Sequence, residues 1–226
     1  MNLPFPDDFI DIHNHGASPA TGVFSIENLI SSEQRVPDKT AGLTYTIGIH
    51  PWHLTENNYQ HQLEKVIKYS NHENIIALGE AGFDRIKGPD MKLQKLAFES
   101  QVKLSEKIKK PLYIHCVKAW EELLYVRKAI RTDMPWLVHG FRGKSELALQ
   151  MISKGMYISF WFDFIIRPEA SGLIRSLPVD RIFLETDGGN INIKDIYYKV
   201  SSDLNLTVQQ LRQQIYSNFI SFFRIK

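Results

Sequence analysis

Residues 9–15 read Phe9-Ile10-Asp11-Ile12-His13-Asn14-His15, a short and mostly apolar run that ends in two histidines. A run of this length is typical of a strand buried in a sheet. Alternate side chains of a strand point to the same side, so His13 and His15 are expected to face the same way. Two imidazoles presented together can bind one metal ion, although a pair with this spacing also occurs by chance in loops.

Similar apolar runs recur along the chain, and most of them lack polar alternation. The clearest are Tyr45-Thr46-Ile47-Gly48-Ile49, Ile75-Ile76-Ala77-Leu78, Leu112-Tyr113-Ile114, Trp136-Leu137-Val138, Met156-Tyr157-Ile158 and Ile182-Phe183-Leu184. Continuous apolar runs favour strands that are buried on both faces, as in parallel sheets. An eighth strand is expected at Gly22-Val23-Phe24-Ser25-Ile26, with almost no helix before it.

Helical patterns separate these runs. Residues 91–109 place apolar side chains on one stripe, and Ser145 is expected to cap a helix that runs to about Lys154. A last helix opens at Thr207 with Gln210 three residues later, which is a capping-box pattern. The alternation of strands and helices predicts an α/β fold. We expect one domain over residues 1–226, a compact TIM-type (β/α)8 barrel with a trimmed first βα unit.

Composition excludes several classes of protein. The 226 residues carry a net charge of +2, which permits an anionic substrate without requiring one. No stretch approaches the roughly 20 apolar residues of a membrane span, and residues 1–8 lack the features of a signal peptide. The single cysteine, Cys116, excludes an intramolecular disulfide and a cysteine-based zinc site. We therefore expect a monomer in the cytoplasm, without membrane association.

Six of the runs are followed by a histidine or a carboxylate, namely His13 with His15, His50, Glu80, His115, His139 and Asp187. In a barrel all carboxyl ends of strands open onto one face, where active sites lie. Imidazole and carboxylate without thiolate suit zinc, manganese, iron or cobalt, and tolerate magnesium. Four of these histidines (His13, His15, His115 and His139) and the two carboxylates exceed the needs of one tetrahedral zinc ion. Two divalent ions bridged by one carboxylate, with a metal-activated water, are the natural arrangement.

Further residues near these strand ends are candidates for substrate contacts. Lys118 and Arg142 lie just past His115 and His139, where a cation could meet an anionic substrate, or they are solvated charges. His50 could touch substrate, and Asp84 is expected to orient its loop by hydrogen bonds. The aromatic residues after strand ends either pack at the rim or stack on bases; they are Trp52, Trp161, Phe162 and Phe164.

The motifs together resemble the TatD-related metal-dependent hydrolases of the amidohydrolase superfamily. The resemblance runs from about residue 10 to 223 and rests on ordered segments of the chain. They are His13-Asn14-His15, Gly48-Ile49-His50-Pro51, Gly79-Glu80-Ala81-Gly82-Phe83-Asp84, Pro111 to His115, His139-Gly140-Phe141-Arg142-Gly143 and Glu185-Thr186-Asp187.

This resemblance implies a hydrolase with two divalent metal ions, Zn²⁺, Mn²⁺ or Mg²⁺. His13, His15 and Asp187 would hold one ion and His115 and His139 the other, with Glu80 bridging both. Asp187 would also act as the base toward the attacking water, and His50 would help to bind phosphate. The implied activity is deoxyribonuclease, including 3′→5′ exonuclease, on single-stranded DNA or on a small phosphoester.

The chain departs from the family pattern at the rim of the site. Gly16-Ala17 follow His15 where the family has an acidic residue, Cys116-Val117-Lys118 follow His115, and Gly188-Gly189 follow Asp187. No proposed ligand is lost, so metal-dependent hydrolysis is better supported than DNA as its substrate. Two alternatives stay open: a hydrolase of cyclic amides, lactones or small phosphoesters on the same dinuclear site, and a non-catalytic binding protein on a degenerate barrel.

Overall fold

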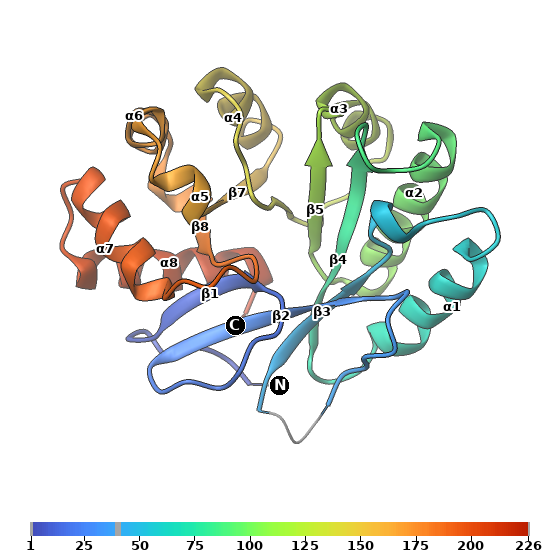
Figure 1. Cartoon of the computed structure of the whole chain (residues 1–226), viewed down its shortest axis with the longest axis horizontal. Coiled ribbons are helices and arrows are strands. Elements are labelled where there is room, and N and C mark those ends of the chain that lie inside the picture. Colours follow the sequence, from blue (N-terminus) through green and yellow to red (C-terminus); the bar gives the residue numbers. More distant parts are fainter. Residues whose placement is uncertain (1, 39–41, 226) are drawn as a thin grey trace.

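The computed structural model describes residues 2–38 and 42–225 of the chain. Eight parallel strands form one sheet in sequence order, from β1 to β8 (Figure 1). The strands are β1 (Phe9–Asn14), β2 (Val23–Ile30), β3 (Thr44–Gly48), β4 (Ile75–Asp84), β5 (Leu112–Val117), β6 (Trp136–Val138), β7 (Met156–Trp161) and β8 (Ile182–Glu185). The fold is a (β/α)8 barrel, as the sequence predicts.

Helices surround the strands from β3 onward. They are α1 (Tyr59–Ser70), α2 (Met91–Ile108), α3 (Trp120–Ala129), α4 (Ser145–Ile152), α5 (Phe162–Ile165), α6 (Pro168–Ser176), α7 (Ile193–Asp203) and α8 (Val208–Phe223), with 3-10 turns η1 (Pro51–His53) and η2 (Val179–Arg181). None of the helices within the described ranges is long and apolar enough to cross a lipid bilayer.

The first part of the barrel has no helical cover of its own. Among the described residues, no helix lies between β1 and β2 or between β2 and β3. On this side the buried Glu27 forms an ion pair with Arg35 and accepts a hydrogen bond from the Gly16 backbone N–H at 3.1 Å. The trimmed first βα unit is therefore confirmed, and side-chain contacts hold the connections around it.

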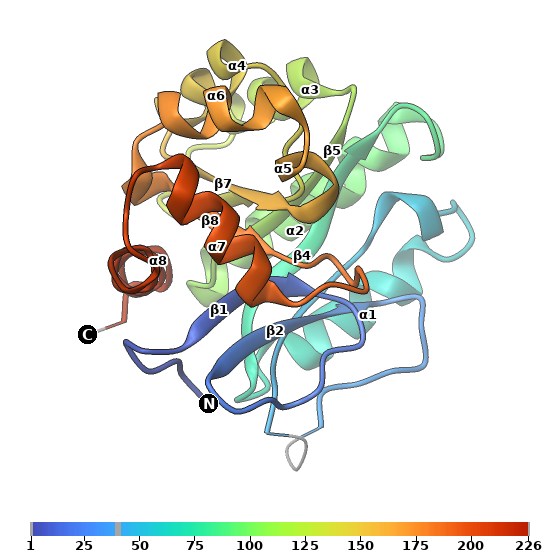
Figure 2. The ribbon, with the colours of Figure 1, turned by 60° about the vertical axis from the view of Figure 1, so that its left-hand side comes forward.

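Side chains close the barrel where β1 meets β8. Within the described part of the chain, the two strands share no ladder of backbone pairs. The Tyr197 hydroxyl donates to the Ile10 carbonyl and accepts from the Ile10 N–H, both at 3.0 Å. The Asp11 carboxylate accepts from the Thr186 N–H at 2.9 Å and from its hydroxyl at 2.7 Å. Figure 2 shows α7 and α8 packed on this side of the barrel, over the seam.

Several local expectations needed correction, and the strand expected at residues 22–26 in fact runs to Ile30 as β2. Ser145 was expected to cap α4, but it is the first helical residue, and Lys144 stands at the cap without a side-chain hydrogen bond. The strand expected to end at Leu78 continues to Asp84, because its pairing with β5 shifts register between Leu78 and Ala81 and then resumes. The capping box of Thr207 and Gln210 at α8 is confirmed.

Candidate metal centre

The structure brings the six predicted ligand residues together at the carboxyl ends of five strands. His13 and His15 come from the end of β1, Glu80 from within β4 and His115 from β5. His139 follows β6 directly, and Asp187 follows β8 by two residues. Donor atoms from these residues form groups in which all atoms lie within 4.8 Å of one another, including His13 with His15 and Asp187.

The Glu80 carboxylate lies at the centre, and each of its oxygens faces a different pair of histidines. Oε2 lies 3.1 Å from His15 Nε2 and 3.5 Å from His13 Nε2. Oε1 lies 2.5 Å from His139 Nε2 and 3.3 Å from His115 Nδ1. A carboxylate whose two oxygens face two different sets of ligands is placed where it could bridge two metal ions.

Asp187 completes one half of the cluster. Its Oδ1 lies 3.5 Å from His13 Nε2 and 3.7 Å from His15 Nε2. Its backbone N–H donates to the His13 carbonyl at 3.1 Å, so β1 and the chain after β8 are held in register at the site. Burial disfavours the ionised form of Asp187, but the close His13 ring and the positive charges of His139 and His13 outweigh burial and lower the pKa of Asp187.

Asn28 in β2 fixes the position of Glu80. Its side-chain amide donates to Glu80 Oε2 at 2.9 Å, and its carbonyl oxygen accepts from the Glu80 N–H at 2.9 Å. Thr46 donates to the same carbonyl oxygen at 2.7 Å. Close backbone packing adds to this restraint, since a methyl group on Gly48 would lie 2.6 Å from the Glu80 carbonyl oxygen. Sequence reasoning missed Asn28; the one signal was a polar residue within a mostly apolar strand.

Hydrogen bonds determine which nitrogen of His115 is free to bind a metal. Its Nε2 lies 3.1 Å from Asp84 Oδ2, so this nitrogen carries the proton and donates to the carboxylate. The lone pair of Nδ1 is then left to face Glu80. Carboxylates commonly orient metal-binding histidines in this manner. Asp84 also accepts from the N–H groups of Ile86 and Lys87 at 2.7 and 2.8 Å, which confirms the loop-orienting role expected from the sequence.

His139 also faces a carboxylate on its far side, at a longer distance and without a hydrogen bond. Its Nδ1 lies 3.5 Å from Glu185 Oε1, and Ser159 donates to the other oxygen of Glu185 at 2.5 Å. Glu185 is fully buried in the barrel. Nε2 of His139 therefore remains for the centre of the site. In the sequence Glu185 belongs to the Glu185-Thr186-Asp187 segment, but nothing there indicates its contact with His139.

His50 lies inside the cluster rather than at its rim, yet its hydrogen bonds differ from those of the other histidines. Its Nδ1 accepts from the Trp52 N–H at 3.1 Å, so a neutral His50 carries its proton on Nε2. Burial lowers the pKa of His50 and keeps the ring neutral at pH 7. Nε2 lies 3.3 Å from His115 Nδ1 and 3.6 Å from Glu80 Oε1. A ring that presents an N–H suits an oxygen of a substrate better than a metal ion.

Charges in the site are strongly coupled. Burial disfavours the ionised form of Glu80, but the positive charges of His139 and His13 and the close contacts with His115 and His13 hold its pKa well below the usual range. Burial and the charge of His139 oppose protonation of His13, but Glu80 and Asp187 outweigh them and raise the His13 pKa to about 9.

The donor set fits divalent metal ions. Both ring nitrogens of His13 are buried and make no hydrogen bond to any described residue. Such groups are costly to bury unless something pairs with them. Neutral imidazoles and carboxylates are ligands that zinc and manganese accept.

A cavity of about 530 Å³ opens above the cluster. It is lined by His115, His139 and Asp187 at its base and by Trp52, Lys87, Lys118, Trp120 and Arg142 at its rim. The structure thus places the predicted contact residues Lys118 and Arg142 at the mouth of the site. Cys116 also borders the cavity, but burial strongly raises the pKa of its thiol, so it stays protonated and is a poor nucleophile.

Comparison with known proteins gives one family across nearly the whole chain. The model of the family described as TatD related DNase matches residues 14–224. An uncharacterized metal-dependent hydrolase of Buchnera aphidicola (subsp. Baizongia pistaciae) is 33% identical over 146 residues, which cover 62% of this chain and 54% of that relative. The uncharacterized metal-dependent hydrolase YcfH of Escherichia coli K12 is 25% identical over 226 residues, covering 92% of this chain and 82% of the relative.

One further relative and one solved structure are also similar to this chain. The Deoxyribonuclease Tat-D of Schizosaccharomyces pombe is 25% identical over 202 residues, covering 82% of this chain and 65% of the relative. Among solved structures, the TatD homolog YJJV of Escherichia coli superposes with a TM-score of 0.77 at 20% identity, over 98% of this chain and all of that one. The second similarity shows the barrel fold.

Proposed function

Because the chain belongs to the TatD related DNase family of metal-dependent hydrolases, we propose that it hydrolyses phosphodiester bonds with two divalent metal ions. The observation that carries this proposal is the position of the Glu80 carboxylate, whose two oxygens face different pairs of histidines. His13, His15 and Asp187 would hold one ion and His115 and His139 the other, with the Glu80 carboxylate placed between the two sets. Divalent ions in such a pair supply positive charge to the phosphoryl oxygens and lower the pKa of water.

Asp187 is the general base of the proposed reaction. Its lowered pKa keeps it ionised at neutral pH, and its side chain is 23% exposed toward the cavity. An ionised carboxylate at this position can orient the attacking water and accept its proton on Oδ1 or Oδ2.

His50 and Lys118 stabilise the developing negative charge on the phosphoryl group, and Arg142 adds positive charge at the mouth of the cavity. His50 donates from Nε2, a direction that the Trp52 N–H fixes by occupying Nδ1. Lys118 and Arg142 line the mouth of the same cavity and bring positive charge to it. Donors and charges that are already oriented cost little reorganisation when charge develops, which makes them effective in catalysis.

DNA is the proposed substrate because one relative, which aligns with 82% of this chain, carries the name deoxyribonuclease. The test combines metal analysis with hydrolysis of 3′- and 5′-labelled single-stranded DNA in Mn²⁺ or Mg²⁺. We expect about two ions per chain and products shortened stepwise from the 3′ end. If the protein bound two ions but cleaved no phosphodiester, the proposed substrate class would be wrong and the metal centre would stand. If it took up no metal, the whole proposal would be wrong.

A further inference from the structure

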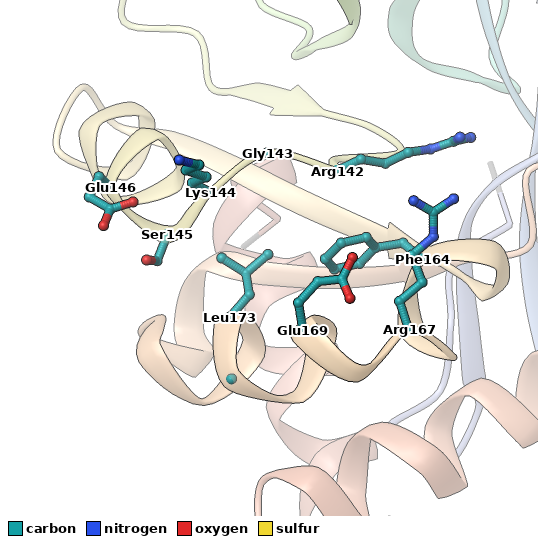
Figure 3. Close-up of a pocket in the computed structure, with 10 residues that line it drawn as sticks. Arg142, Gly143, Lys144, Ser145, Glu146, Phe164, Arg167, Glu169 and Leu173 are labelled. Carbon is teal, nitrogen blue, oxygen red and sulfur yellow. The ribbon is translucent and has the colours of Figure 1, made fainter.

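A second cavity lies beside the first, between the loop after β6 and the helices α5 and α6 (Figure 3). Its volume is about 510 Å³. Its lining includes Arg142, Lys144, Phe164, Arg167, Glu169 and Leu173. Arg142 and Gly143 line both cavities, so the two adjoin at these residues. The loops of a barrel at the carboxyl ends of its strands are where substrates bind.

Two arginines from different loops meet at one end of this cavity. Figure 3 shows the Arg142 and Arg167 guanidinium groups side by side, with Lys144 and Glu146 at the other end. Asp163 joins the two, with its Oδ2 at 2.9 Å from Arg167 Nη2 and 3.6 Å from Arg142 Nη1. The Arg142 guanidinium also stacks on the Trp161 ring, 4.3 Å from its centroid.

This arginine pair is available to an incoming anion. The side chains of Arg142, Asp163 and Arg167 are 47%, 45% and 43% exposed. Ion pairs with this exposure contribute little to stability because solvent screens them. A phosphate, which carries acceptor oxygens for two guanidinium forks, can therefore displace the Asp163 contact from both arginines.

The rest of the cavity suits a sugar and a base. Phe164 and Leu173 give it an apolar wall, and the Glu169 carboxylate extends into it (Figure 3). A volume of about 510 Å³ lies within the range of roughly 300–1,000 Å³ that is typical of small-ligand sites. A carboxylate beside an apolar wall can accept a hydrogen bond from the exocyclic amine of a base or from a sugar hydroxyl.

We propose that the second cavity binds the nucleotide adjacent to the scissile phosphodiester, with that nucleotide's phosphate held between Arg142 and Arg167. The inference rests on the proposed function and extends it, because it makes a chain of at least two phosphodiesters the preferred substrate. A small diester fills the metal centre alone and gains nothing from the second cavity.

The first measurement is binding, which does not depend on hydrolysis. Fluorescence anisotropy of a labelled oligothymidylate of eight nucleotides is followed against salt, with the metal removed by chelator. Arg167→Gln is compared with Arg175→Gln, which removes an exposed charge from the same helix outside the cavity. We expect Arg167→Gln to weaken binding and to reduce the slope of log K against log[salt] by about 0.7, the value for one lost phosphate contact on a single strand. Arg175→Gln should leave the slope unchanged.

The second measurement is chain-length preference in Mn²⁺. The ratio of kcat/KM for the eight-nucleotide substrate to that for a thymidine dinucleotide should fall about fivefold to tenfold in Arg167→Gln and not in Arg175→Gln. If both variants had the same salt slope and the same kcat/KM ratio, the second cavity would not be a nucleotide site, and the proposed function would still stand. A wild-type protein that cleaves no diester, yet binds the oligonucleotide with an Arg167-dependent slope, would overturn the function and keep the cavity as a nucleotide site.

Discussion

Glu80 has different neighbours for its two oxygens, which makes it the residue with the largest expected effect on the site. Glu80→Gln would replace one carboxylate oxygen with an NH₂ group, which cannot bind a metal ion, and would remove the negative charge. We expect bound metal to fall from about two ions to one or fewer, and kcat to fall at least about 1,000-fold. Elemental analysis and circular dichroism check this, with Glu121→Gln on the surface of α3 as the control. Full activity in Glu80→Gln would exclude the proposed bridge.

His50 Nε2 and His115 Nδ1 lie 3.3 Å apart. Because the two rings carry their protons on nitrogens with different roles, their substitutions should affect metal content and kcat differently. His50→Gln should keep its metal and lose about 10²–10³ in kcat, the usual cost of one donor to a developing oxyanion. His115→Gln should lose one metal ion, since its Nδ1 lone pair is the proposed ligand. Metal content measured beside kcat separates the two outcomes. Loss of metal in His50→Gln would show that His50 is itself a ligand.

The His13 pKa of about 9 makes the stability of the metal-free protein depend on pH. The ordinary pKa of histidine is 6.5, so between these values the folded state binds more protons than the unfolded state. This stabilisation is therefore complete below pH 6.5 and is lost as the pH rises through about 9. Urea unfolding in chelator at pH 6, 8 and 10 should show the wild type losing stability relative to His13→Asn. A difference between the two proteins that does not change with pH would contradict this prediction.

At the level of single residues, the sequence predicts the proposed ligands but not the groups that orient them. Each candidate ligand follows an apolar run, and this local signal is visible without a structure. Asn28 and Glu185 are not visible in this way, because their partners Glu80 and His139 lie on distant strands. Only the curvature of the barrel brings these pairs together.

At the level of the elements, the seam between β1 and β8 is held by side-chain hydrogen bonds. Tyr197→Phe would remove the hydroxyl that satisfies both backbone groups of Ile10, leaving two buried polar groups unpaired. Each such group costs about 1–3 kcal/mol, so we expect a loss of about 2–6 kcal/mol in the free energy of unfolding. Urea unfolding checks this, with the exposed Tyr125→Phe as the control. Equal stability of the two variants would mean that water replaces the hydroxyl at the seam.

The sequence predicts where the strands lie better than it predicts the residues at which they end. Short apolar runs identify seven strands because both faces of each are buried. The end of β4 is missed because its glycines, which suggest a turn, instead allow close contact with β5: a methyl group on Gly82 would lie 2.0 Å from the His115 carbonyl oxygen. Local composition cannot distinguish a turn from a close approach between strands.

For the whole molecule, metal ions should add to stability because they bind the ligand cluster of the folded chain and not the unfolded chain, in which these residues lie apart. At a free Mn²⁺ concentration about 100 times Kd, one bound ion contributes about 2.7 kcal/mol. This corresponds to a rise in Tm of roughly 5–11 °C for a chain of this size. Differential scanning calorimetry in chelator and in Mn²⁺ measures the shift, and Glu80→Gln should show less than half of it. An unchanged Tm in the wild type would argue against specific binding.

The seam also bears on how the chain reaches its native state during synthesis. Ile10 and Asp11 find their partners 175 to 187 residues further along the chain. The ribosome must therefore translate Tyr197 before the first strand can complete its hydrogen bonds, and until then one side of β1 is exposed. Contacts of such long sequence separation form late and are sensitive to competing association. Slow translation upstream of Tyr197 would lengthen this interval, and a chaperone that shields exposed strands would act on the nascent chain at this stage.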